Sequence, residues 1–132
     1  MTLQEFYPQV GGSYESVLSR LFSEALIRRF VLKYGGDPTF ERLDAALAAQ
    51  DWEAAFLAVH TLKGTAANLG FDRMYQSASL LTEELRGPKP LENWQLWEAV
   101  KKEQACLLES IRKLLQETDD SSASHVGIRN VQ

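Results

Sequence analysis

The stretch that decides the fold is residues 51–70, which read DWEAAFLAVHTLKGTAANLG. Apolar side chains recur in it every three or four residues, which predicts a helix that packs on one side. Asp51 is a good N-cap, because its carboxylate can accept hydrogen bonds from free N–H groups of the first turn. Gly70 marks the end, because glycine turns left-handed without a Cβ penalty. The expected buried stripe is Trp52, Ala55, Phe56, Val59, Leu62, Ala66 and Leu69.

His60, Lys63 and Gly64 fall beside that stripe on the same predicted helix. Glycine in a helix interior costs about 1 kcal/mol relative to alanine, so Gly64 indicates either open space or a close helix–helix contact. A histidine beside an apolar face is often half-buried with a hydrogen-bond partner. An imidazole with an ammonium group one turn later also suits a phosphate or another bulky anionic group. Spacing by itself leaves these alternatives open.

The run His60-Thr-Leu-Lys63-Gly64, followed by Ala66-Ala67-Asn68-Leu69-Gly70, resembles the histidine-containing phosphotransfer (HPt) domain family. That family has the pattern H-x-L-K-G on a helix of small residues that ends in L-G. The similarity covers about residues 11–115. It implies a helical bundle with the histidine exposed on its side.

The resemblance also implies a chemistry. His60 would accept a phosphoryl group on its distal nitrogen from the aspartyl phosphate of a receiver domain, and would donate it to another receiver. Lys63 would screen the phosphoryl oxygens and Gly64 would leave room for the receiver. Magnesium and the catalytic carboxylates would belong to the receiver, so this chain needs no cofactor or metal of its own. It lacks a nucleotide-binding loop and the kinase signature motifs, so we expect a carrier and not an enzyme.

Two positions depart from or extend the family pattern. Some members place a glutamine on the following helix, where it holds the histidine ring, and by spacing the matching residue here is Thr82. A threonine is shorter and would bond more weakly or through water. Arg86, one turn further on, would either help to bind phosphate or favour the helix C-terminus. We expect the partner surface around His60 to include Thr61, Ala67 and Asn68, with exposed apolar residues of the next helix.

Composition limits the other function classes. The chain has 132 residues and a formal net charge of −4, which argues for one domain and against a nucleic-acid binder. One cysteine, Cys106, excludes an internal disulfide and a cysteine-based zinc cluster. Neither a membrane span nor a signal peptide is visible. We therefore expect a cytoplasmic monomer without membrane insertion.

The rest of the chain predicts an all-α fold: an antiparallel four-helix bundle with additional short N-terminal helices. We expect an N-terminal arm at 1–12, a bundle at 13–117 and a flexible polar tail at 118–132. Within the bundle, helices are predicted over 14–20, 24–34, 38–50, 52–69, 73–86 and 91–117, with Asp72 as the N-cap of the fifth. The second, fourth, fifth and sixth of these would form the bundle, and the third would cover one end. Trp94 is expected on the buried stripe of the last helix.

Three functional alternatives follow. The first is a phosphorelay carrier that exchanges phosphate with response-regulator receiver domains and, upstream, a sensor histidine kinase or hybrid kinase. The second is a regulatory bundle that binds a receiver or kinase without being phosphorylated; loss of the histidine would mark it, and His60 is present. The third is the histidine-bearing fragment of a larger sensor kinase.

Overall fold

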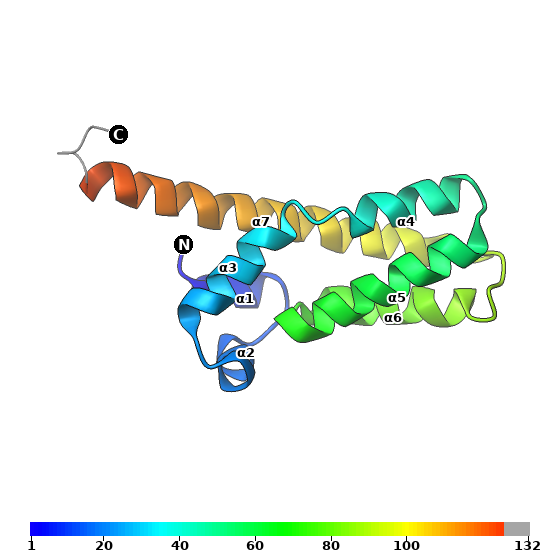
Figure 1. Ribbon diagram of the computed structural model, residues 1–132, viewed down its shortest axis with the longest axis horizontal. Helices are drawn as coiled ribbons and strands as arrows, with labels where there is room; N and C mark the ends of the chain where they lie inside the picture. Colours follow the sequence, from blue (N-terminus) through cyan, green and yellow to red (C-terminus); the bar gives the residue numbers. More distant parts are fainter. Residues whose placement is uncertain (126–132) are drawn as a thin grey trace.

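The computed structural model describes residues 1–125, and it describes side chains for residues 1–116. All regular structure in that part is helical, as predicted, and no strand occurs in it. Figure 1 shows the helices in chain order: α1 (Leu3–Gln9), α2 (Tyr14–Leu21), α3 (Glu24–Tyr34), α4 (Thr39–Ala48), α5 (Trp52–Leu69), α6 (Asp72–Leu85) and α7 (Gln95–His125).

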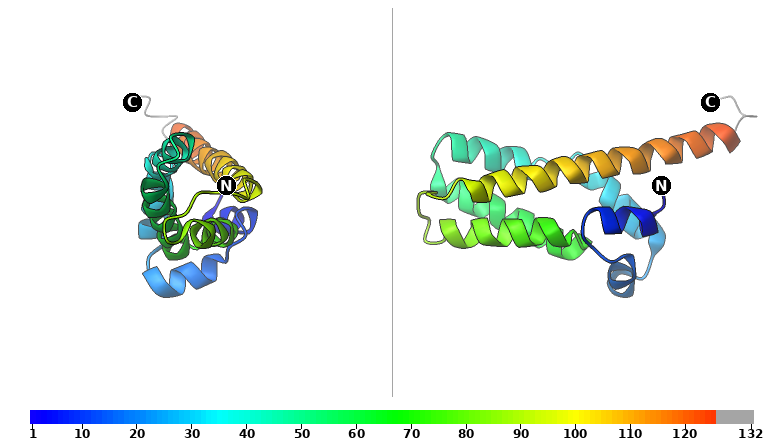
Figure 2. Two further views of the ribbon diagram at one scale, coloured as in Figure 1. Left: turned by 90° about the vertical axis from the view of Figure 1, so that its right-hand side faces the viewer. Right: turned by 180° about the vertical axis from the view of Figure 1, so that it is seen from behind.

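The bundle is formed by α4, α5, α6 and α7. Helix α5 packs against α4 and α6, and α6 packs against α7. Figure 2 shows that the α4–α5 and α6–α7 connections lie at the same end of the molecule. The helices α1, α2 and α3 lie together at the opposite end (Figure 1).

Our prediction that α3 would be a bundle helix and that α4 would cover one end was wrong. Gly35 keeps a right-handed helical conformation (φ −58°, ψ −25°), and Figure 1 shows that the chain does not reverse between α3 and α4. It reverses instead at Gln50, which has a left-handed φ of 57°. Helix α4 therefore lies beside α5 along its length, and α3 makes fewer contacts with α5 and α7.

The start and end of α5 are as predicted. Asp51 Oδ1 accepts a hydrogen bond from the Ala54 N–H at 3.1 Å, and Gly70 has φ 75°. A Cβ at Gly70 would approach Val17 Cγ2 to 2.3 Å, so the position also requires glycine for space. Helix α6 follows at once. Its N-cap is Phe71 and not Asp72, which is already the first helical residue.

The buried side of α5 matches the predicted stripe closely. Five of its seven residues are buried, and the other two, Trp52 and Phe56, are half-buried against the core. Each fully buried side chain of leucine or valine size contributes about 1.5–3 kcal/mol. This stripe fixes the rotation of α5 about its axis. The buried five are Ala55, Val59, Leu62, Ala66 and Leu69.

The segment expected as an N-terminal arm contains a helix. Thr2 Oγ1 accepts from the Glu5 N–H and the Glu5 carboxylate accepts from the Thr2 N–H, so the two residues form a capping box. Phe6 and Tyr7 are fully buried.

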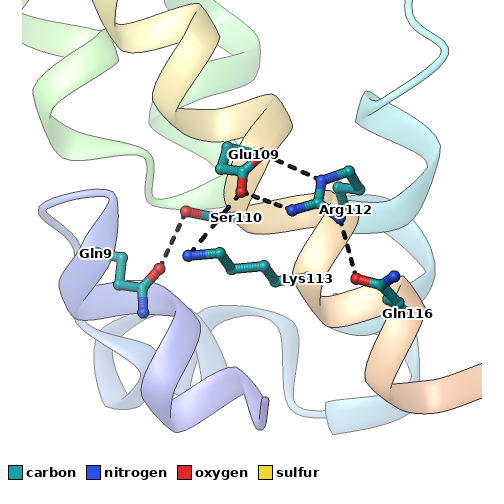
Figure 3. Close-up of polar contacts among 6 residues, drawn as sticks. All are labelled: Gln9, Glu109, Ser110, Arg112, Lys113 and Gln116. Carbon is teal, nitrogen blue, oxygen red and sulfur yellow. Dashed lines mark hydrogen bonds and ion pairs between the residues drawn. The ribbon is translucent and has the colours of Figure 1, made fainter. Parts of the chain in front are cut away.

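Helix α1 lies against α7, as Figure 3 shows. There the Ser110 hydroxyl donates a hydrogen bond to Gln9 Oε1 at 3.2 Å.

Helix α7 differs from its prediction at both ends. It begins at Gln95, and the preceding Trp94 lies outside the helix with 41% of its surface exposed. Asn93 Oδ1 accepts a hydrogen bond from the Gln95 N–H, which favours a helix start here. The helix continues to His125, through part of the segment expected as a tail. Residues 126–132 lie outside the described residues.

Candidate functional site

His60 lies on the solvent-facing side of α5. Its side chain is exposed, whereas Val59, one residue before it, and Leu62, two residues after it, are buried. Within the described part of the chain, no hydrogen bond holds the His60 ring. The alternative of a half-buried histidine with a hydrogen-bond partner therefore does not apply. An exposed imidazole on a packed, well-capped helix is open to another molecule.

The imidazole ring of His60 lies against the phenyl ring of Phe56. The imidazole and the phenyl ring are stacked, with centroids 6.1 Å apart and planes inclined by 15°. The two residues are four positions apart on α5, and helical side chains lean toward the N-terminus, which brings His60 over Phe56. We predicted Phe56 only as a core residue. Its contact with His60 could have been predicted from the sequence, because side chains four residues apart on a helix are neighbours.

Lys63 lies one turn beyond His60 and is half-buried. Its Nζ is 5.9 Å from the ring centroid of Tyr75 on α6. The pKa of Glu83 lies below its usual value, chiefly because Arg86 donates hydrogen bonds to it and to a smaller extent because of the charge on Lys63. The Lys63 ammonium group therefore lies near the Tyr75 ring at the α5–α6 surface.

Gly64 faces open space. A Cβ built on Gly64 would meet no heavy atom within 4 Å. A close helix–helix contact therefore does not explain this glycine, and the open-space alternative is confirmed. The space directly beside the Gly64 Cα, one turn beyond His60, is therefore open.

Thr82 and Arg86 differ in their positions. Thr82 is fully buried, and its hydroxyl donates to the Ala78 carbonyl oxygen at 2.7 Å, one turn earlier in α6. The expectation that Thr82 would bond to the His60 ring is thus not met. Arg86 is exposed, and its guanidinium lies 5.4 Å from the centroid of the Phe56 ring. It also donates from Nε and Nη2 to both Glu83 carboxylate oxygens, at 3.1 and 2.8 Å.

The surface around His60 combines small polar and apolar side chains. Thr61, Ala67 and Asn68 are exposed, as expected. Leu57 of α5 is 60% exposed, and on α6 the exposed Tyr75 ring lies near the Lys63 ammonium group. Between α4 and α5 runs a groove of about 380 Å³ that is lined by Thr39, Arg42, Ala54, Leu57, Ala58 and Thr61.

The residues that the structure describes contain no group of three or more His, Cys, Asp or Glu side chains placed to hold a metal ion. None of their helices has both the length and the hydropathy needed to cross a membrane.

Comparison with known proteins gave one match. The model of the Hpt domain family matches residues 36–121, about two thirds of the chain. Searches of curated proteins and of solved structures found no match. The matched segment contains α4, α5, α6 and most of α7, and it includes His60, Lys63 and Gly64. Hpt domains are phosphotransfer carriers of two-component signalling, and they typically interact with receiver domains and kinases. The chain belongs to the Hpt domain family.

Proposed function

We propose that His60 accepts a phosphoryl group from the aspartyl phosphate of a receiver domain and passes it to an aspartate of another receiver. The observation that carries this proposal is the exposed His60 imidazole on α5, with Lys63 one turn away and open space at Gly64. Membership of the Hpt family supports the choice of phosphate over another anionic group.

The transfer needs one free lone pair on the imidazole. In the neutral ring, one nitrogen carries the proton and the other can attack phosphorus. We assign the attack to Nε2, with the proton on Nδ1. The N–P bond forms while the P–O bond to the aspartate breaks, and the bonding electrons leave with the carboxylate. Return of the group to a second carboxylate reverses these changes. Phosphoryl transfer of this kind depends mainly on alignment and charge neutralisation.

Charge neutralisation on this chain falls to Lys63, whose ammonium group would approach the phosphoryl oxygens as a point charge. Arg86 is a second cation close to the site, and its Nε and Nη2 donate to Glu83. A guanidinium has five N–H donors, so Nη1 is left for a phosphate, and the exposed pair with Glu83 is itself weak, at about 0–1 kcal/mol. The receiver would supply magnesium and the catalytic carboxylates.

The same proposal makes the chain a carrier without kinase activity, acting as a monomer in the cytoplasm. Cys106 is a free cysteine, which fits a reducing compartment. The upstream partner would be a sensor histidine kinase or hybrid kinase. Binding to a receiver should be transient, since a relay must release each partner.

The test is phosphotransfer from a panel of phosphorylated receiver domains with magnesium present. We expect an acid-labile, alkali-stable label on the wild-type chain and none on His60→Ala. His125→Ala is the matched control, because the chain has only these two histidines, and it should keep the label. Label that persists in His60→Ala would refute the assignment. Receiver binding without any label would favour the regulatory bundle.

A further inference from the structure

The His60 imidazole has one clear neighbour that limits its orientation. Its plane is within 15° of the Phe56 ring plane. Thr82, the residue that by spacing would hold the ring, is buried and bonded to Ala78. Among the described residues, no side chain forms a hydrogen bond with the imidazole. The orientation of His60 therefore depends on an aromatic contact.

Phe56 is itself held in place. It is half-buried and packs against the core from α5, so part of its ring is fixed by the bundle. The Arg86 guanidinium lies against the same ring, at 5.4 Å from its centroid. The guanidinium also donates two hydrogen bonds to Glu83. The phenyl ring is thus in contact with the core and with the residue that follows α6.

We propose that Phe56 is a positioning residue for phosphoryl transfer, which holds the His60 imidazole in a plane that presents its nitrogens to the receiver. The two rings are offset and nearly parallel, whereas the lone pair that attacks phosphorus lies in the plane of the imidazole, at its edge. A contact of this kind favours one orientation of the ring plane and leaves the direction of attack within that plane. In this chain, aromatic stacking orients the His60 ring in place of a hydrogen bond from a longer side chain at position 82. This inference rests on the proposed phosphotransfer at His60.

The decisive variants are Phe56→Leu, which keeps an apolar side chain but removes the ring, and Phe56→Tyr, which keeps the ring. We expect Phe56→Leu to lower the transfer rate at saturating receiver by about 3- to 10-fold, from the usual strength of an aromatic pair. The receiver concentration for half-maximal rate should change little, and Phe56→Tyr should restore the rate. Phe40→Leu is the matched control, since Phe40 stacks on Trp97 at 5.2 Å in another part of the bundle.

A spectroscopic measurement on the wild-type chain tests the contact without any receiver. A phenyl ring stacked on an imidazole shifts the nuclear magnetic resonances of the imidazole carbon-bound protons by its ring current. We expect the His60 ring protons to be shifted relative to those of an unstructured histidine peptide, and the shift to disappear in Phe56→Leu. Chemical labelling by phosphoramidate, a small phosphodonor, should also slow in Phe56→Leu.

The outcomes separate this inference from the proposed function. Unshifted His60 resonances in the wild type, or a full transfer rate in Phe56→Leu, would overturn the positioning role while His60 could still be labelled. A change confined to the half-maximal receiver concentration would make Phe56 a docking contact and would also overturn it. Absence of label on the wild-type chain would instead refute the phosphotransfer proposal, and the resonance shift would still report on the stack.

Discussion

The Tyr7 hydroxyl donates a hydrogen bond to the Leu69 carbonyl oxygen at 2.7 Å, across 62 positions of sequence. Leu69 is the last residue of α5, so this bond ties α1 to the C-terminal end of the helix that carries His60. Arg20 of α2 reinforces the same end, because its Nη1 donates to the Ala67 and Asn68 carbonyl oxygens at 3.3 and 3.1 Å. The family match begins at residue 36, so α1 and α2 support α5 from outside the matched segment.

Tyr7→Phe should lower the free energy of unfolding by about 1–3 kcal/mol, because it leaves the buried Leu69 carbonyl oxygen without this donor. Urea unfolding followed by circular dichroism would measure the change. Tyr75→Phe is the matched control, since Tyr75 is 39% exposed and its loss of a hydroxyl should have little effect. Equal stability of Tyr7→Phe and the wild type would show that the bond contributes nothing net.

Stability should fall in alkaline solution because of Tyr7 and Tyr34. Burial raises the pKa of both phenols above the ordinary tyrosine value, and for Tyr34 the charges of Asp37 and Glu41 add to this. Below about pH 10 both phenols are neutral in the folded and the unfolded chain, so their contribution is fully present. At higher pH the unfolded chain loses its tyrosine protons first. Each tyrosine then lowers the free energy of unfolding by about 1.4 kcal/mol per pH unit.

The alkaline effect can be assigned with a single variant. Tyr34 donates its hydroxyl proton to Gln104 Oε1, and Tyr34→Phe has no phenol to ionise. Its urea midpoint should therefore fall less steeply than that of the wild type between about pH 9 and about pH 11. An identical slope in the two proteins would exclude Tyr34 as the titrating group.

Gly64→Gln should stabilise the helix and obstruct transfer. Glutamine has the better helix propensity and the Cβ meets no atom within 4 Å, so we expect the free energy of unfolding to rise by about 0.5–1 kcal/mol. The long side chain would occupy the space that a receiver needs beside His60. Transfer rates from a phosphorylated receiver would test this, with Gly64→Ala as the smaller control. Normal transfer by the glutamine variant would contradict the proposed role of the open space.

Lys63→Ala should slow phosphotransfer by about tenfold, because one positive charge near the phosphoryl oxygens is lost. Folding should change little, since lysine and alanine are both good helix formers. The matched control is Lys101→Ala, because the Lys101 Nζ also lies over an aromatic ring, that of Trp97 at 5.7 Å, on a different helix. Equal transfer rates for Lys63→Ala and the control would remove the proposed role of Lys63.

Periodicity and capping predicted α5 well, since both are local properties. The apolar spacing gave its buried side, and Asp51 and Gly70 gave its ends. The same logic missed α1, although Thr2 and Glu5 form a capping box that is visible in the sequence. Short helices have few residues over which to establish a period, and α1 is stable here because Phe6 and Tyr7 are buried in the shared core.

By itself, the sequence determined the helical class and the buried side and ends of α5, because these follow from spacing and capping along one helix. The exposure of His60 and the open space at Gly64 were expected only from the family resemblance, because spacing alone left the alternatives open. Only the tertiary structure decided which helices lie beside α5 and what contacts the imidazole. The α3–α4 connection could reverse the chain or continue it, and the choice depends on packing against α5 and α7. Likewise, Thr82 faces the core and Arg86 reaches the Phe56 ring because of how α6 is rotated against α5, and that rotation is set by long-range contacts.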